Sequence, residues 1–408
     1  MSEEEMAKHP LQIANFRLLW LGQSLILCAV QFWIVALTWL VLQKIGSGVA
    51  IGTVLIAAAV PRALLTLIGG AISDRFSPYR IATFSALTNT ILVGIVATLL
   101  WFNAIQLGYL IAIAGIFGIS DAFLYPATLS ALPRLIDKSL LMKANALMQG
   151  GEQITNVIGP AAAGFVIGAF GLAIAFTINT VLFALGGLFL YLIRQPKNAQ
   201  NPSTASSIQQ LLSEIVEGVR YAWRNSAIRI SLLIIGMLNL ATLGPLVVGV
   251  AKLVELRFGG SATTYGYMQA AFGVGAFLGV LATSQIKSIK TPGITLVLLA
   301  YALGIGTAGL GFVQQVWMAY SVIALMGLGG GFVSVIAIAW LQQQTVAEMQ
   351  GRMMGLLTFT AVALDPFSQA ASGFLMDINL TLMFVIAGVI MLVTAVVTSF
   401  NQAVRTAG

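Results

Sequence analysis

Long apolar runs, separated by short polar breaks, fill the chain from residue 17 to residue 400. Each run has about the 20 residues that an α-helix needs to cross the ~30 Å hydrocarbon core of a bilayer. A membrane β-barrel would instead show weak alternation over segments of about ten residues. The pattern predicts an all-α membrane protein with twelve spans, at residues 17–41, 49–70, 81–102, 107–129, 146–168, 171–193, 228–251, 262–285, 292–313, 316–341, 353–376 and 380–400.

One longer polar break separates two sets of six runs. Residues 195–205 are polar and carry Pro, Asn and Ser, which is typical of a flexible linker. Apolar residues then recur at helical spacing among charged ones, which predicts an amphipathic helix at the membrane interface. Its apolar positions are Ile208, Leu211, Leu212, Ile215, Val219 and Trp223. We therefore expect an N-terminal six-helix bundle at residues 1–195, a cytoplasmic linker with this helix at 196–225, and a second, pseudo-symmetric six-helix bundle at 226–408.

Composition and charge support a membrane protein with both termini in the cytoplasm. Hydrophobic residues make up 59% of the chain and charged residues 8%, whereas a soluble domain carries about 25% charged residues. If the N-terminus lies inside, sixteen of the 20 Lys and Arg residues fall in segments that face the cytoplasm, as the positive-inside rule requires. The net charge of +7 then follows from topology and needs no nucleic-acid partner.

The sequence offers no set of residues for catalysis or for a cofactor. His9 and Cys28 are the single residues of their types, so we expect no metal site built on His or Cys, and G-x-x-x-x-G-K-[ST] does not occur. Residues 304–309 fit G-x-G-x-x-G but lie inside an apolar run without a preceding strand. Small residues there favour close helix packing instead, as do the pairs Gly275/Gly279 and Gly327/Gly331.

Four charged residues lie inside predicted spans: Arg62, Asp121, Glu152 and Asp365. Each costs about 2.5–3.5 kcal/mol at a helix centre on insertion scales, so each is a functional hypothesis. The three acids are candidates for proton coupling. Asp365 precedes Pro366, which frees a backbone carbonyl one turn earlier, and its carboxyl either carries the coupled proton or packs as a hydrogen-bonded acid.

The other charges have alternative readings. Arg62 and Asp121 fall at similar depths on spans 2 and 4, so they either form a structural pair or leave Arg62 to meet an anionic group of a substrate. Glu152 is either a gate or an interfacial charge that extends toward water. Uncharged residues at mid-depth are candidates for a substrate cavity, although helix–helix contacts are the commoner use of such residues. They are Gln31, Asn156, Asn239, Gln269, Phe272 and Gln369.

The loop after span 2 resembles a motif of a known transporter family. Gly70, Asp74, Arg75 and Arg80 are similar to the G-x-x-x-D-R-x-G-R-[RK] loop of the major facilitator superfamily, with Ser77-Pro78-Tyr79 in place of a glycine and two basic residues. The resemblance implies a latch on the cytoplasmic side, in which Asp74 docks on the positive N-terminus of span 11 near residues 351–352. A basic loop that only sets topology is the alternative.

Further stretches resemble the branch of that superfamily which holds the enterobactin exporter and macrolide efflux pumps. They are NFRLLWLGQS (15–24), VALTWLVLQ (35–43), PRALL (61–65), LPRLIDKSLLMKANAL (132–147), IGPAAAG (158–164) and GRMMGL (351–356). The resemblance implies alternating access about a midplane site and export of a bulky amphipathic small molecule by proton antiport. It also implies a monomer in the bacterial inner membrane whose partners are substrate, protons and lipid. An uncoupled facilitator or lipid flippase is the alternative, and a receptor that transports nothing comes third.

Overall fold

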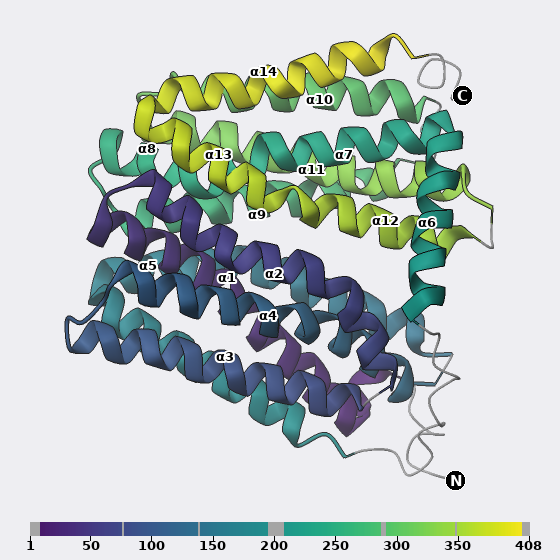
Figure 1. Cartoon of the computed structure of the whole chain (residues 1–408), viewed down its shortest axis with the longest axis horizontal. Helices are drawn as coiled ribbons and strands as arrows, with labels where there is room; N and C mark the ends of the chain where they lie inside the picture. Colours follow the sequence, from purple (N-terminus) through teal and green to yellow (C-terminus); the bar gives the residue numbers. More distant parts are fainter. Residues whose placement is uncertain are drawn as a thin grey trace. The chain divides into compact units, whose positions relative to one another are not determined.

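The computed structural model of the chain describes residues 9–75, 77–137, 139–194, 208–286, 291–346 and 349–401, with side chains except at 67–75, 208–215, 351 and 358. Within these ranges all regular structure is helical and no strand occurs (Figure 1). The α-helices are α1 (Ala14–Ile45), α2 (Gly48–Arg75), α3 (Pro78–Trp101), α4 (Leu107–Ala131), α5 (Leu141–Tyr191), α6 (Ile208–Arg224), α7 (Ser226–Gly244), α8 (Val250–Arg257), α9 (Ala262–Ser284), α10 (Pro292–Leu310), α11 (Val316–Gln343), α12 (Gln350–Ala363), α13 (Asp365–Ile378) and α14 (Leu380–Ser399). Short 3₁₀ turns lie at Pro10–Gln12 and Leu132–Arg134, and a π-helical turn, η4, at Pro245–Gly249.

The helices form two compact units, and α1 and α2 each contribute to both. The first unit comprises Met1–Val41 and Ala57–Ala205, and the second comprises Leu42–Ile56 and Ser206–Gly408. Pro61 lies inside α2, and because proline has no backbone N–H, the carbonyl of Ala57 loses its helical hydrogen bond. The backbone ladder of α2 is therefore interrupted close to the residue at which the helix passes from one unit to the other.

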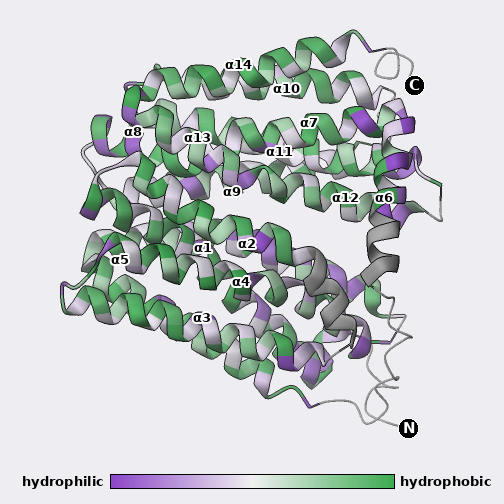
Figure 2. Cartoon of the chain, viewed as in Figure 1, coloured by the Kyte–Doolittle hydropathy of each residue, from purple (hydrophilic) through white to green (hydrophobic). Residues whose placement is uncertain are grey.

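Ten helical segments in the described part of the chain are long and apolar enough to cross a membrane. Figure 2 shows hydrophobic residues along most of the length of these helices and hydrophilic ones near their ends and on α6. One segment is α5, whose 51 residues were expected to hold spans 5 and 6. Gly171 is its non-helical residue, with φ 84° and ψ 173°, a conformation that glycine adopts without steric cost. The helical stretches before and after Gly171 each have about the length of a span.

Spans 7 and 11 are not the continuous α-helices that the sequence predicted. The expected helix 353–376 is divided at Leu364 into α12 and α13, and the expected helix 228–251 passes into the π-helical η4 at Pro245. A proline ring clashes with the carbonyl four residues earlier and offers no N–H. Pro366 and Pro245 therefore explain both interruptions.

The helix α6 is amphipathic in its described part. Figure 1 shows it lying across the ends of α7 and α12. The apolar side chains of Val216, Val219 and Trp223 are exposed along one stripe, while Arg220 and Arg224 are exposed beside them. This arrangement is what an interfacial helix needs, with one face for lipid and another for water.

Apolar packing and an ion pair hold α6 against the other helices of the second unit. Arg352 Nη1 of α12 lies 2.7 Å from Glu217 Oε2 of α6, a partly exposed pair that contributes at most about 1 kcal/mol. Burial of apolar side chains contributes more. The buried cluster joins Ala222 of α6 to Ile228, Leu341, Met349, Met353 and Leu357.

Glycines bring α9 and α11 into backbone contact, as the sequence predicted. A Cβ atom at Gly275 or Gly279 would collide with the carbonyl oxygens of Ala324 or Leu328 on α11. A Cβ atom at Gly327 or Gly331 would collide with carbonyl oxygens on α9. Small residues drive helix association in lipid because they let the backbones approach closely.

We expect Gly327→Ala to destabilise the protein, because its methyl group would push against the Phe272 carbonyl oxygen. Overpacking of this kind costs about 1–3 kcal/mol. Gly309→Ala is the matched control, because a Cβ at that position would have no atom of another described element within 4 Å and alanine is the better helix former by about 1 kcal/mol. Thermal unfolding of both purified variants in detergent checks this. A Gly327→Ala midpoint equal to or above that of Gly309→Ala would contradict the packing argument.

Candidate functional site

A pocket of about 300 Å³ lies within the first unit, between α1, α2, α4 and α5. Five residues predicted from their depth alone line it together: Gln31, Arg62, Asp121, Glu152 and Asn156. The rest of the lining is mostly apolar. It consists of Gln23, Ile26, Leu27, Val30, Ile34, Leu124, Tyr125 and Thr128. An apolar pocket with a few convergent polar groups is the usual form of a small-molecule site.

Arg62 and Asp121 form an ion pair in this pocket. Arg62 Nε lies 3.2 Å from Asp121 Oδ2, with 43% of the arginine side chain and 9% of the aspartate side chain exposed. The buried carboxylate therefore has its counter-charge, as a charge at this depth requires. A guanidinium has five N–H donors, so pairing through Nε does not exhaust the capacity of Arg62 to bind an anionic group.

Two more polar pairs connect the helices around the pocket. Tyr125 on α4 donates its hydroxyl to Glu152 Oε2 on α5 at 3.3 Å. Gln31 Nε2 on α1 donates to Asn156 Oδ1 on α5 at 2.5 Å. Residues four apart share a helix face, so Glu152 and Asn156 point the same way from α5.

The predicted cavity residues of the second unit have packing contacts. Asn239 Nδ2 donates to the Ile235 carbonyl in its own helix at 3.0 Å. Gln269 Nε2 donates to the Leu246 carbonyl in η4 at 3.2 Å, and Phe272 lies at the close contact of α9 with α11. These contacts match the helix-packing alternative, and a place in the substrate cavity stays a prediction for these three residues.

Asp365 and Gln369 both lie on α13 and are half-buried. Asp365 is the first residue of that helix, directly after the interruption at Leu364. Gln369 Oε1 is buried without a hydrogen-bond partner among the described residues. Both residues belong to the second unit, whereas Glu152 and Asp121 line the pocket of the first. Proton coupling by Asp365 stays a prediction.

The structure describes only some of the residues of the predicted cytoplasmic latch. The side chains of Gly70, Asp74 and Arg75 lie outside the described residues, and Arg80 is exposed in the first turn of α3. At the expected docking position, the start of α12, Arg352 is paired with Glu217 of α6. The latch therefore stays a prediction.

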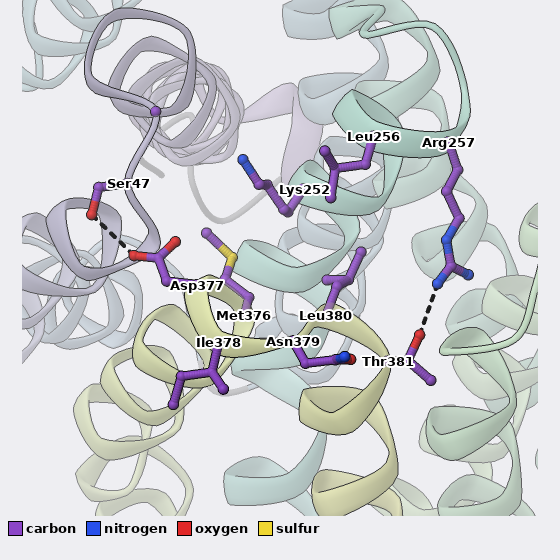
Figure 3. A pocket seen from close by; sticks show the side chains of 11 residues that line it. Ser47, Lys252, Leu256, Arg257, Met376, Asp377, Ile378, Asn379, Leu380 and Thr381 are labelled. Atoms are coloured by element: carbon purple, nitrogen blue, oxygen red, sulfur yellow. Dashed lines mark hydrogen bonds between the residues drawn. The ribbon is translucent and has the colours of Figure 1, made fainter.

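Asp377, at the end of α13, was missed by the sequence reasoning. Its carboxylate accepts hydrogen bonds from the backbone N–H groups of Gly48 at 2.7 Å and Val49 at 3.0 Å, and from the Ser47 hydroxyl at 3.1 Å (Figure 3). It therefore caps the positive N-terminus of α2. Gly48 and Gly373 permit this contact, since a Cβ at either would collide with the backbone of the other helix.

Cations lie beside this cap in a pocket of about 620 Å³ (Figure 3). Lys252 Nζ lies 2.6 Å from Glu255 Oε2. Arg257 donates to the Gly311 and Val313 carbonyls at 2.9 Å each and to the Thr381 hydroxyl at 2.8 Å. Both cations are thus engaged by neighbouring protein groups, which is the arrangement of a structural cluster.

The sequence model of the Major Facilitator Superfamily matches residues 19–364 of the 408. The chain belongs to the major facilitator superfamily. It is therefore an integral membrane protein of a transporter family and not of an enzyme family.

Curated relatives of this superfamily member include named efflux proteins. The chain is 24% identical over 355 residues to the multidrug efflux pump Tap of Mycolicibacterium fortuitum, covering 84% of this chain and 85% of the relative. It is 25% identical over 315 residues to the enterobactin exporter EntS of Shigella boydii, covering 75% of this chain and 72% of that protein.

Solved structures of other transporters share the fold. The nucleoside transporter NupG aligns with a TM-score of 0.76 at 14% identity, over 94% of this chain and 98% of its own. A POT family transporter in complex with 5-aminolevulinic acid aligns with a TM-score of 0.78 at 12% identity, over 97% and 96%. At such low sequence identities, the structural similarity supports a shared fold alone.

We expect Arg62→Gln to destabilise the transporter, because it leaves the buried Asp121 carboxylate without its counter-charge. Removing one partner of such a pair costs about 1–3 kcal/mol or more. The double variant Arg62→Gln/Asp121→Asn removes both charges and should recover most of the unfolding midpoint. Thermal unfolding in detergent measures both. A double variant no more stable than Arg62→Gln would contradict the pairing.

Asp377→Ala should also lower the unfolding midpoint, because three donors at the start of α2 lose their acceptor. Loss of a helix cap costs about 0.5–2 kcal/mol. Asp137→Ala, at an exposed position outside the spans, is the control for loss of one negative charge. Equal midpoints for the two variants would show that the cap contributes nothing.

Proposed function

We propose that this transporter exports a bulky, amphipathic small molecule by alternating access, driven by proton antiport. The observation that carries the proposal is the pocket of the first unit, in which apolar residues surround an ion pair and a further carboxyl, Glu152. The names of the relatives Tap and EntS, a multidrug efflux pump and an enterobactin exporter, support export.

The charges of the pocket support exchange of a proton for a substrate. Arg62 balances Asp121, so Glu152 is the carboxyl whose charge the pocket does not neutralise by an ion pair among its lining residues. A proton or a cationic group of a substrate can supply that charge, and the two compete for it. Tyr125, which donates to Glu152, would hold the carboxyl in place in the exchange. Asp365 is a second candidate for the coupled proton.

The topology forms part of the same proposal. We propose twelve spans in two six-helix bundles, both termini in the cytoplasm, and a monomer in the bacterial inner membrane. The Asp74 loop would latch the cytoplasmic side. A proton that moves inward gains about 2.3 kcal/mol per 100 mV, enough to hold a concentration ratio of roughly tens to one.

An uncoupled facilitator or lipid flippase is the second candidate function. The observation that favours it is Gln31, bonded to Asn156, at mid-depth in α1, where the efflux branch that the sequence resembles often has an acid. Such a carrier needs no group that exchanges a proton.

Transport by purified protein in proteoliposomes separates these functions. With an imposed pH gradient and ethidium as the amphipathic cation, we expect accumulation that a proton ionophore abolishes. Glu152→Gln should lower gradient-driven accumulation at least tenfold while downhill ethidium exchange persists, because the carboxyl that releases the proton is gone. Asp365→Asn tests the second acid in the same way, and Asp137→Asn is the control.

The alternatives give different results in the same assay. Accumulation unaffected by Glu152→Gln but lost in Asp365→Asn would move coupling to α13. Ethidium movement that ignores the pH gradient in the unaltered protein would favour the facilitator. Movement of a headgroup-labelled phospholipid without ethidium transport would favour the flippase.

A further inference from the structure

An apolar groove beneath the amphipathic helix has no part in the proposed transport site. Its volume is about 320 Å³, and it lies in the second unit between α6, α7 and α12. It is lined by Val219, Ala222, Trp223, Arg229, Leu232, Leu233, Gly236, Met237, Leu356, Thr360 and Leu364. Arg229 is the single charged residue of that lining, so the groove is an apolar trough with one cation.

The groove extends along the spans from their ends. On α7 the lining runs from Arg229 to Met237, and on α12 from Leu356 to Thr360, with Leu364 directly after the end of α12. Eight residues of helix rise about 12 Å. The groove thus starts at the level of α6 and continues toward the membrane interior. A lipid acyl chain follows the same direction from its headgroup.

The apolar face of α6 leads into this groove. Val219 and Trp223 both line it and are also exposed, Trp223 to 71%. Tryptophan collects at the level of lipid headgroups, where one end of the ring meets apolar chains and the other meets water. The exposed ring of Trp223 therefore places the headgroup region beside the end of α6.

Basic residues lie in the second half of α6 and in the first turn of α7. Arg220, Arg224 and Arg229 are exposed. Arg229 donates from Nη1 to the Trp223 carbonyl at 2.9 Å, and its guanidinium lies 5.8 Å from the centre of the Trp223 ring. These contacts hold Arg229 in place, and its remaining N–H donors suit the oxygens of a phosphate.

We propose that this groove binds one anionic phospholipid, with an acyl chain between α7 and α12 and the phosphate at Arg229, flanked by Arg220 and Arg224. The apolar lining would accommodate the acyl chain, and the three arginines would favour a negatively charged headgroup. Each cation near an anionic headgroup contributes to binding. The site concerns α6 and the second unit, so it does not depend on which compound the transporter moves.

The test uses delipidated full-length protein in a neutral detergent, titrated with phosphatidylglycerol or phosphatidylcholine that carries brominated acyl chains. Bromine quenches nearby tryptophan, and the difference between the unaltered protein and Trp223→Phe isolates the signal of Trp223. We expect half-maximal quenching at about fivefold or more lower concentration for phosphatidylglycerol. Arg229→Gln should remove that difference, and Arg229→Lys should retain part of it.

Arg194→Gln is the matched control, since Arg194 is exposed just after the end of α5 in the other unit and should leave both titrations unchanged. Equal titrations for the two lipids in the unaltered protein, or the same lipid preference in Arg229→Gln, would overturn the proposal. Reversal of the quenching by an equal concentration of inorganic phosphate would overturn it as well, because it would indicate a phosphate site without a chain. A circular-dichroism melt checks that Arg229→Gln has the same helical content and unfolding midpoint as the unaltered protein.

Discussion

The absence of water from the bilayer core is the constraint on which the whole structure depends. Each backbone group must find its partner inside a helix, and each polar side chain must find one nearby. Threonine hydroxyls accordingly donate to the carbonyl four residues earlier in their own helix, as Thr53, Thr90 and Thr283 do. Where a side chain is charged, a local carbonyl is not enough, and the neighbouring helix must supply the counter-charge, as α4 does for Arg62.

The two units satisfy this constraint with different chemistry. In the second unit, Gln269 bonds the Leu246 carbonyl within η4, the segment that follows α7, and glycines hold α9 against α11. In the first unit, ionisable side chains of three helices border a pocket. The charged pocket thus belongs to one unit, while the other contributes Asp365 from α13.

Features that repeat along the chain could be predicted from the sequence. Features that depend on contacts between residues far apart in the sequence could not. Hydropathy located ten segments that the described part of the chain forms as helices of membrane-spanning length, and depth alone selected Arg62, Asp121 and Glu152, because a charge inside an apolar run is conspicuous. The helix interruptions at Pro245 and Pro366 were not predicted. A proline inside a span produces either a kink or a break, and the packing of neighbouring helices decides which. The Asp377 cap joins residues 329 positions apart, and an acid at the end of a span has no distinctive sequence pattern.

The passage of α2 from one unit to the other has a mechanical consequence. Its first turn is fastened by Asp377, while its later residues belong to the first unit. Movement of the units against each other, which the proposed alternating access requires, would therefore strain α2, as it would α1, whose residues Leu42–Ile45 belong to the second unit. Pro61 leaves α2 one backbone hydrogen bond short near the crossing point, so resistance to bending is lowest there. In the proposed transport cycle, the stiffness of α2 at this point would help to set the rate at which the protein changes conformation.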